Sequence, residues 1–128
     1  MDYKEISQRL AAPFKASEID WLVQALSEEN MQGLAIPYIQ SRAIQNRLDE
    51  VLTPAGWRNE FILWHPNSQL CNILLRIVYE DGTAEWVGKS DGSGNSDIEP
   101  IKGELSDAMK RAAVQWGIGR FLYQMGSI

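Results

Sequence analysis

The hydrophobic pattern of the first third of the chain predicts helices. Apolar residues recur there every three or four positions, which is the spacing of one helix face. Ser17 followed by Asp20 resembles a capping box, so a helix is expected to begin there, and Gly33 and Pro37 interrupt the pattern. The apolar positions of this predicted helix are Ile19, Leu22, Val23 and Leu26.

A second helix is predicted to begin near Ser41. It ends at the Thr53-Pro54 pair, because proline breaks a helix and the residue before it disfavours the helical conformation. The apolar stripe of this helix consists of Ile44, Leu48, Val51 and Leu52.

The pattern changes to a strand period in the middle of the chain. Large β-prone residues extend from Trp57 to Trp64, and Pro66-Asn67 is typical of a turn. From Cys71 to Tyr79 the odd positions are apolar, as in a strand with one buried face. Asp81-Gly82 is a strong hairpin signal, so Thr83 to Gly88 is predicted to return as a third strand of an antiparallel meander.

The longest helical pattern runs from Ile101 to Tyr123, after a Gly-, Ser- and Asp-rich loop from Ser90 to Asp97. We expect one apolar stripe to pack on the sheet, and a second apolar set, well away from it, to contact a partner subunit. The predicted fold is α+β: a short antiparallel meander packed on a long C-terminal helix, preceded by N-terminal helices. The stripe consists of Ile101, Leu105, Ala108, Met109, Ala112, Trp116 and Tyr123, and the second set of Val114, Ile118 and Phe121.

Length and composition are typical of a globular protein with one domain, here residues 1–128. The formal net charge of −5 excludes a generally basic nucleic-acid coat, so a polyanion would need a local basic patch. The single cysteine, Cys71, excludes an internal disulfide and favours a reducing, cytoplasmic location. The sequence shows no secretion signal, and no apolar run approaches the ~20 residues that span a bilayer.

Signals of enzymatic chemistry are weak. Residues 89–97 contain glycines but no lysine in the phosphate-binding place, and His65 is the only histidine, so we expect no nucleotide and no His-rich metal site. One group of acidic residues is dense enough to consider a magnesium site, which would require two or three of them to converge on one ion. A magnesium-dependent DNA-processing nuclease is therefore an alternative function. This group consists of Asp91, Asp97, Glu99, Glu104 and Asp107.

Basic residues of the last helix are more informative. Lys110 and Arg111 follow Asp107 at spacings at which an ion pair stabilises a helix by only ~0.2–0.5 kcal/mol. The same two side chains are also suited to contact phosphates, and the pattern alone leaves both interpretations open. Further basic residues are Lys102 and Arg120 on another face of this helix, and Arg42 and Arg47 on the second helix.

The last helix also carries a family signature. Lys102–Tyr123 reads KGELSDAMKRAAVQWGIGRFLY, with a Ser-Asp-Ala-x-Lys-Arg-Ala run from Ser106 to Ala112 and a Trp116-Gly117 pair. It resembles the signature helix of the Rad52/22 family of single-strand annealing proteins. The segments LAAPFKASEIDWLVQ and SRAIQNRLDEVLTPAGW resemble bacterial and bacteriophage members, and Arg76–Gly88 matches the family hairpin. The resemblance covers nearly the whole chain.

This resemblance implies ATP-independent binding of single-stranded DNA and annealing of complementary strands in homologous recombination and double-strand break repair. It implies no enzymatic activity, no cofactor and no metal. Subunits would assemble side by side into a ring or helical filament with the DNA in a groove, in the cytoplasm of a bacterial or phage-infected cell. Lys110 and Arg111 match the family's Lys-Arg pair and are the first candidates for DNA binding. The family also uses an arginine upstream of the sheet, for which Arg42 is the match and Arg47 the competing one. Lys102 is a further candidate.

Two positions depart from the eukaryotic pattern of the family. Val114 stands where those members carry another basic residue, and Glu80 stands where they have a lysine before the Asp-Gly turn. The second change argues against a separate outer DNA path. Trp57, Trp64 and Trp86 are candidate platforms for bases, with burial in the core as the competing interpretation.

Overall fold

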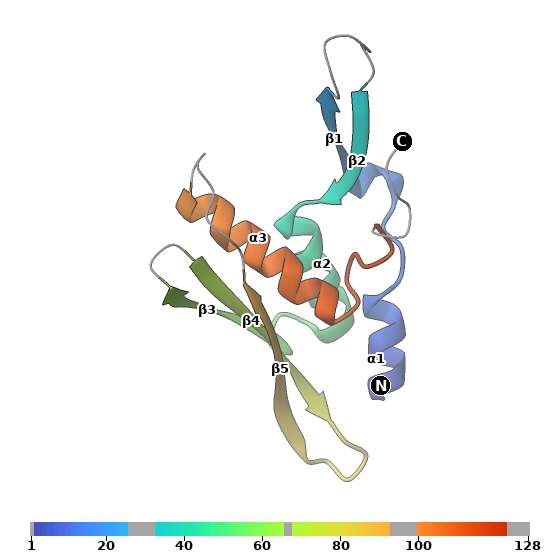
Figure 1. Ribbon diagram of the computed structural model, residues 1–128. Helices are drawn as coiled ribbons and strands as arrows, with labels where there is room; N and C mark the ends of the chain where they lie inside the picture. The colour runs from blue at the N-terminus through green and yellow to red at the C-terminus, as the bar shows by residue number, and fades with distance from the viewer. Residues whose placement is uncertain (1, 26–32, 66–67, 93–99, 123–128) are drawn as a thin grey trace.

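A three-stranded antiparallel sheet with a helix across it lies at the centre of the computed structural model, which describes residues 2–25, 33–65, 68–92 and 100–122 (Figure 1). The predicted α+β class is confirmed. None of the described helices is long and apolar enough to cross a membrane. The helices are α1 (Tyr3–Leu10), α2 (Ser41–Leu52) and α3 (Pro100–Gln115), with a short 3₁₀ helix at Ala16–Glu18. The strands are β1 (Ile19–Ala25), β2 (Gly33–Ile39), β3 (Trp57–His65), β4 (Ser68–Val78) and β5 (Ala84–Gly92).

β4 is the central strand of the order β3-β4-β5, and its predicted alternation is confirmed. The register places Leu75 opposite Trp57 on β3 and Val87 on β5, so these three side chains share the face that packs on α3. β5 extends to Gly92, so the start of the predicted loop belongs to this strand, while the predicted Pro66-Asn67 turn lies outside the described residues. The buried odd positions of β4 are Cys71, Ile73, Leu75 and Ile77.

The turn between β4 and β5 forms at the predicted Asp81-Gly82 pair. Gly82 has φ 87°, a conformation that favours glycine. The Tyr79 N–H donates to the Thr83 carbonyl (2.8 Å) across the turn. The Asp81 carboxylate accepts from the hydroxyl (2.6 Å) and the N–H (3.0 Å) of Thr83, and these bonds lower the pKa of Asp81.

α3 packs across β4 and β5 through small side chains. Ala108 and Ala112 are fully buried, and Met109 and Trp116 are nearly so, which confirms the described part of the predicted stripe. Ala113, which was not in the predicted stripe, is fully buried as well. Small side chains allow the helix to approach the sheet closely. The stripe positions whose side chains lie outside the described part are Ile101, Leu105 and Tyr123.

The C-terminal helix ends at Gln115, short of the predicted boundary at residue 123. The N–H of Ile118 donates to the Ala113 carbonyl (3.0 Å), and the N–H of Gly117 donates to the Val114 carbonyl (2.9 Å). This pair of bonds is a Schellman motif, which requires a left-handed residue that glycine adopts easily, and Gly117 has φ 93°. The chain therefore reverses direction where the prediction continued the helix.

This reversal brings the second apolar set back to the protein's own core. Ile118 is 1% exposed, and the ring of Phe121 stacks on Phe14 with the ring centroids 6.1 Å apart. Val114 is half-buried. The expectation that Val114, Ile118 and Phe121 form a patch for a partner subunit is therefore wrong, because it assumed a continuous helix through Gly117.

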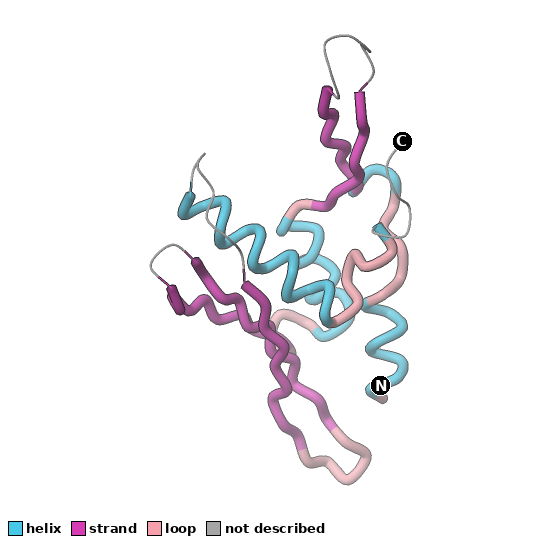
Figure 2. The backbone as a smooth tube through the Cα atoms, viewed as in Figure 1, coloured by secondary structure: helices cyan, strands magenta, loops and turns pink. Residues whose placement is uncertain are grey.

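The helix predicted from Ser17 is also wrong. β1 and β2 pair antiparallel there, with Trp21 opposite Pro37, and they form a hairpin that stands away from the three-stranded sheet (Figure 2). Lys15, and not Ser17, occupies the cap of the short 3₁₀ helix that precedes β1. Leu26 of the predicted stripe lies outside the described residues.

α2 has the predicted boundaries, Ser41 to Leu52. Its buried face packs with α1, which begins with the Asp2 carboxylate accepting from the Glu5 N–H (2.8 Å). Thr53 follows the helix with φ 64°, a conformation that is unfavourable for a β-branched residue. The buried residues that these two helices contribute to the core are Ile6, Leu10, Ala43, Ile44, Leu48 and Val51.

Candidate nucleic-acid interface

The candidate site lies where β2 leads into α2 beside α3 (Figure 1). Tyr38 is near the end of β2, and Lys110 lies in the second half of α3. The Lys110 Nζ lies 5.3 Å from the centroid of the Tyr38 ring, which is within the range of cation–π attraction. Both side chains are half-buried, so part of each stays accessible to a ligand.

Two further basic residues on α2 and α3 are exposed arginines. Arg42 lies in the first turn of α2, and Arg111 follows Lys110 on α3 at about 100° around the helix axis. The Gln40 amide at the cap of α2 donates to Asp20 Oδ2 (2.8 Å), which ties the β1–β2 hairpin to the start of α2. We call Tyr38, Arg42, Lys110 and Arg111 the junction site. Lys102 lies nearer the start of α3, and its side chain is outside the described part.

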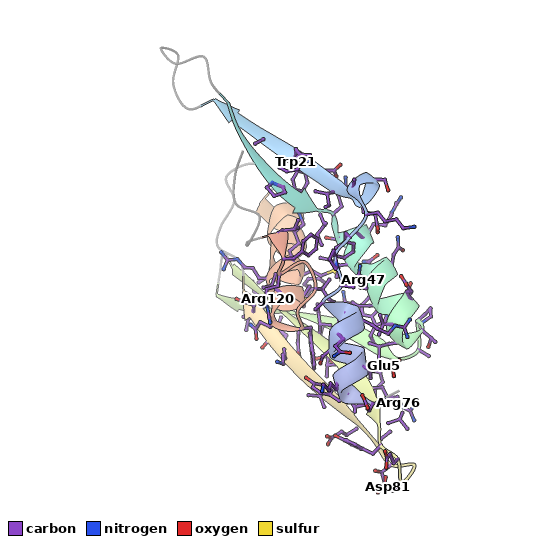
Figure 3. All side chains as sticks on the ribbon, turned by 90° about the vertical axis from the view of Figure 1, so that its right-hand side faces the viewer. Glu5, Trp21, Arg47, Arg76, Asp81 and Arg120 are labelled. Carbon is purple, nitrogen blue, oxygen red and sulfur yellow. The ribbon has the colours of Figure 1, made fainter. Side chains whose placement is uncertain are left out.

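Arg47, the competing candidate, is used within the protein. Its guanidinium lies between α2 and the segment that follows α1 (Figure 3). Burial lowers the pKa of Arg47 from its ordinary value, and the charges of Glu50 and Glu18 oppose this shift. Arg42 is therefore the more accessible of the two arginines. The oxygen atoms that accept hydrogen bonds from Arg47 are the carbonyls of Arg9 (3.3 Å), Leu10 (2.9 Å), Ala12 (2.6 Å) and Pro13 (3.3 Å).

Arg120 and Lys89 stabilise the C-terminal end of α3. Arg120 donates to the carbonyls of Val114 (2.7 Å) and Gln115 (3.2 Å). The Lys89 ammonium lies 3.4 Å from the Gln115 carbonyl and 5.0 Å from the centroid of the Trp116 ring. Cations in these positions oppose the negative end of the helix dipole, so both residues have a structural role.

The acidic group proposed for magnesium is described only in part. Asp91 is half-buried in β5, where its carboxylate accepts from the Gly92 N–H (2.7 Å) and the Gln115 amide (3.1 Å). Within the described part of the chain, no three His, Cys, Asp or Glu residues come together as they would at a metal ion. The members whose side chains fall outside the described part are Asp97, Glu99, Glu104 and Asp107.

The candidate tryptophans differ in their surroundings. The Trp57 Nε1 donates to Asp49 Oδ1 (2.7 Å), and the indole packs against the core. Trp86 is 39% exposed on the sheet face opposite α3, with the Arg58 Cζ 4.7 Å from its ring centroid. The core interpretation therefore holds for Trp57 and not for Trp86. The Trp64 side chain lies outside the described part.

A family model described as Rad52/22 family double-strand break repair protein matches residues 2–127. The chain belongs to the Rad52/22 family. Two similar proteins bear the name single-stranded DNA-binding protein DdrA. The one from Deinococcus radiodurans is 34% identical over 126 residues, and the one from Deinococcus deserti is 32% identical over 125 residues. The alignments cover 98% of this chain and 58% and 60% of these relatives, respectively, so the chain spans less than two-thirds of their length.

Membership of the Rad52/22 family confirms the resemblance inferred from the sequence. The signature run from Ser106 to Ala112 lies on α3, and the Trp116 Nε1 at the end of the signature donates to the Ile73 carbonyl (2.9 Å) in the core. Tyr38 is not among the residues predicted from the sequence. Its aromatic ring close before the predicted helix start was the available signal, but the partner on α3 became visible only in the fold.

Proposed function

We propose that this Rad52/22 family chain binds the backbone of single-stranded DNA at the junction site and anneals complementary strands in homologous recombination and double-strand break repair. The observation that carries the proposal is the Lys110 ammonium over the Tyr38 ring, together with the exposure of Arg42 in the first turn of α2 and of Arg111 at the next position of α3. The names of the two Deinococcus relatives support the choice of ligand.

The chemistry of this surface suits sequence-independent binding. The Tyr38 ring lies on one side of the Lys110 ammonium, and an ammonium has three N–H donors, which suit phosphate oxygens. Contacts to phosphates leave base edges available for pairing, as annealing requires. The junction site needs no nucleotide hydrolysis and no metal ion for this role, so we propose a non-enzymatic protein.

Assembly of several copies would raise the affinity of the junction site for DNA. A single copy has few cations in the junction site and a net charge of −5, so its affinity for DNA is low. Salt screens charges over ~8 Å at physiological ionic strength, so distant carboxylates repel DNA at the junction site only weakly. Repetition of the site in a ring or helical filament raises the effective concentration of each contact. We therefore propose a homo-oligomer that acts in the cytoplasm of a bacterial or phage-infected cell.

The proposal is tested with the double variant Lys110→Ala/Arg111→Ala. Its affinity for a labelled oligo-dT strand, measured by fluorescence anisotropy, should fall by about tenfold or more, while the particle mass stays unchanged. Lys4→Ala, which removes an exposed cation from α1, is the matched control and should bind as the wild type does. Wild-type affinity in the double variant, or binding that is insensitive to salt, would contradict the proposal.

The magnesium-dependent nuclease is the competing function from the sequence. It gains no support from the family or the two relatives. Incubation of a labelled single strand with the protein and magnesium separates the two functions. We expect the strand to keep its length while complementary strands anneal.

A further inference from the structure

Asp20 brings a carboxylate to the face of the β1–β2 hairpin that carries Tyr38. The two residues are cross-strand partners in the register, and such partners point to the same face with Cβ atoms about 4.5–5.5 Å apart. Tyr38 is the residue whose ring centroid lies 5.3 Å from the Lys110 Nζ. A negatively charged group therefore lies next to the aromatic ring that contacts a cation of the junction site.

The carboxylate of Asp20 is held in place by a neutral partner. The Gln40 Nε2 donates to Asp20 Oδ2 (2.8 Å), and Gln40 is the cap residue of α2. This bond fixes the position of the carboxylate without neutralising it, because an amide carries no charge. Asp20 is half-buried, and salt screens a partly buried charge less than an exposed one.

Asp20 and a DNA phosphate are attracted to the same positive region. The bond from Gln40 draws the carboxylate towards the start of α2, where the helix dipole favours an anion and where Arg42 lies in the first turn. A phosphate at the Lys110 ammonium would lie at a distance from Asp20 on the order of the ~8 Å screening length at physiological salt. Two negative charges at this separation still repel each other.

We infer that Asp20 is an affinity-determining residue of the junction site: its carboxylate, held by Gln40, competes with DNA phosphates and lowers the affinity for the strand. This inference rests on the proposed function and names a residue that limits its strength. A limited affinity suits annealing, because a strand must leave the protein once its bases are paired.

The test compares Asp20→Asn with Glu5→Gln. Both substitutions remove one negative charge, but Glu5 is exposed on α1, away from Trp21 and the hairpin (Figure 3). The asparagine oxygen can still accept from Gln40, and thermal unfolding verifies that the fold is retained. Fluorescence anisotropy with labelled oligo-dT at low salt should show an affinity about two- to fivefold higher for Asp20→Asn and unchanged for Glu5→Gln. The gain should shrink as salt is added.

Three results would overturn the inference. Wild-type affinity in Asp20→Asn, with a change only in Asp20→Ala, would show that Asp20 acts solely through its bond with Gln40. A loss of affinity for oligo-dC in Asp20→Asn would make the carboxylate an acceptor for base amino groups. An equal gain in Glu5→Gln would assign the effect to the net charge of the protein.

The Lys110→Ala/Arg111→Ala variant separates this inference from the proposed function. If it loses affinity while Asp20→Asn gains none, the junction site stands and the inference fails. If it binds DNA as the wild type does, the proposed function itself fails. Addition of Asp20→Asn to this double variant should give a smaller gain, because Lys110 no longer draws a phosphate towards the carboxylate. A gain that persists in full would place the effect of Asp20 elsewhere and contradict the inference.

Discussion

The guanidinium of Arg47 lies over the ring of Phe14, with the Arg47 Cζ 4.1 Å from the ring centroid. The same guanidinium donates to four main-chain carbonyls between Arg9 and Pro13. One side chain of α2 thus fixes the irregular segment between α1 and the short 3₁₀ helix. Arginine suits this role because its planar fork of donors reaches several acceptors at once.

Arg47→Ala should lower the free energy of unfolding by about 2–4 kcal/mol, because part-buried carbonyls lose their donor and Phe14 loses its cation. Arg47→Lys should lower it less, since an ammonium retains the charge but not the fork. Urea unfolding followed by circular dichroism measures both. Fully folded Arg47→Lys should bind DNA as the wild type does, and a selective loss of affinity would return Arg47 to the DNA site.

Tyr38 is predicted to hold the Lys110 ammonium through its ring and not its hydroxyl. Tyr38→Phe should therefore keep the affinity for single-stranded DNA, whereas Tyr38→Leu should reduce it about two- to fivefold, as expected from loss of an exposed cation–π contact. Fluorescence anisotropy at fixed salt measures the difference. Equal affinity in the Phe and Leu variants would show that the ring has no part in binding.

Thr53 provides a test of backbone strain after α2. Its φ of 64° costs about 1–3 kcal/mol in a residue with a Cβ atom, and glycine adopts it without that cost. Thr53→Gly should therefore raise the free energy of unfolding by about 1 kcal/mol, after the added freedom of the unfolded chain is counted. Thr53→Ala keeps a Cβ and serves as the control. A destabilised Thr53→Gly protein would contradict this account.

The buried thiol of Cys71 should lower the free energy of unfolding at high pH. Burial raises the pKa of its thiol from 9.0 to about 11, so the folded state holds the proton more tightly than the unfolded state. The stabilisation is complete below pH 9 and is lost as the pH rises towards 11, by up to roughly 2–3 kcal/mol. Urea unfolding of wild type and Cys71→Ala across this range should show their difference in stability narrowing. A constant difference would contradict the prediction.

The parts of the fold predicted correctly have patterns that no alternative structure shares. The alternation from Cys71 to Ile77 and the Asp81-Gly82 turn fit only a strand and a hairpin. Ile19 and Val23, in contrast, fit both a helix face and an alternating strand through Trp21. Pairing with β2 decides between these two possibilities, and that contact is invisible in a local pattern.

The end of α3 and the partner of Tyr38 were missed for different reasons. Gly117 was the available signal for the helix end, because a glycine after an apolar stripe is typical of a Schellman motif. The proximity of Tyr38 to Lys110 depends on how the β1–β2 hairpin leads into α2 beside α3. Contacts between residues so distant in the sequence follow from the packing of several elements, so the basic residues were identified and their aromatic neighbour was not.

Lys110 shares its helix with the fully buried Ala108, Ala112 and Ala113. A ligand that binds the ammonium consequently contacts a helix whose other face lies in the core, and any ligand selective for the folded state raises its apparent stability. Melting temperature should then report occupancy directly, which offers a label-free titration for strands of any length.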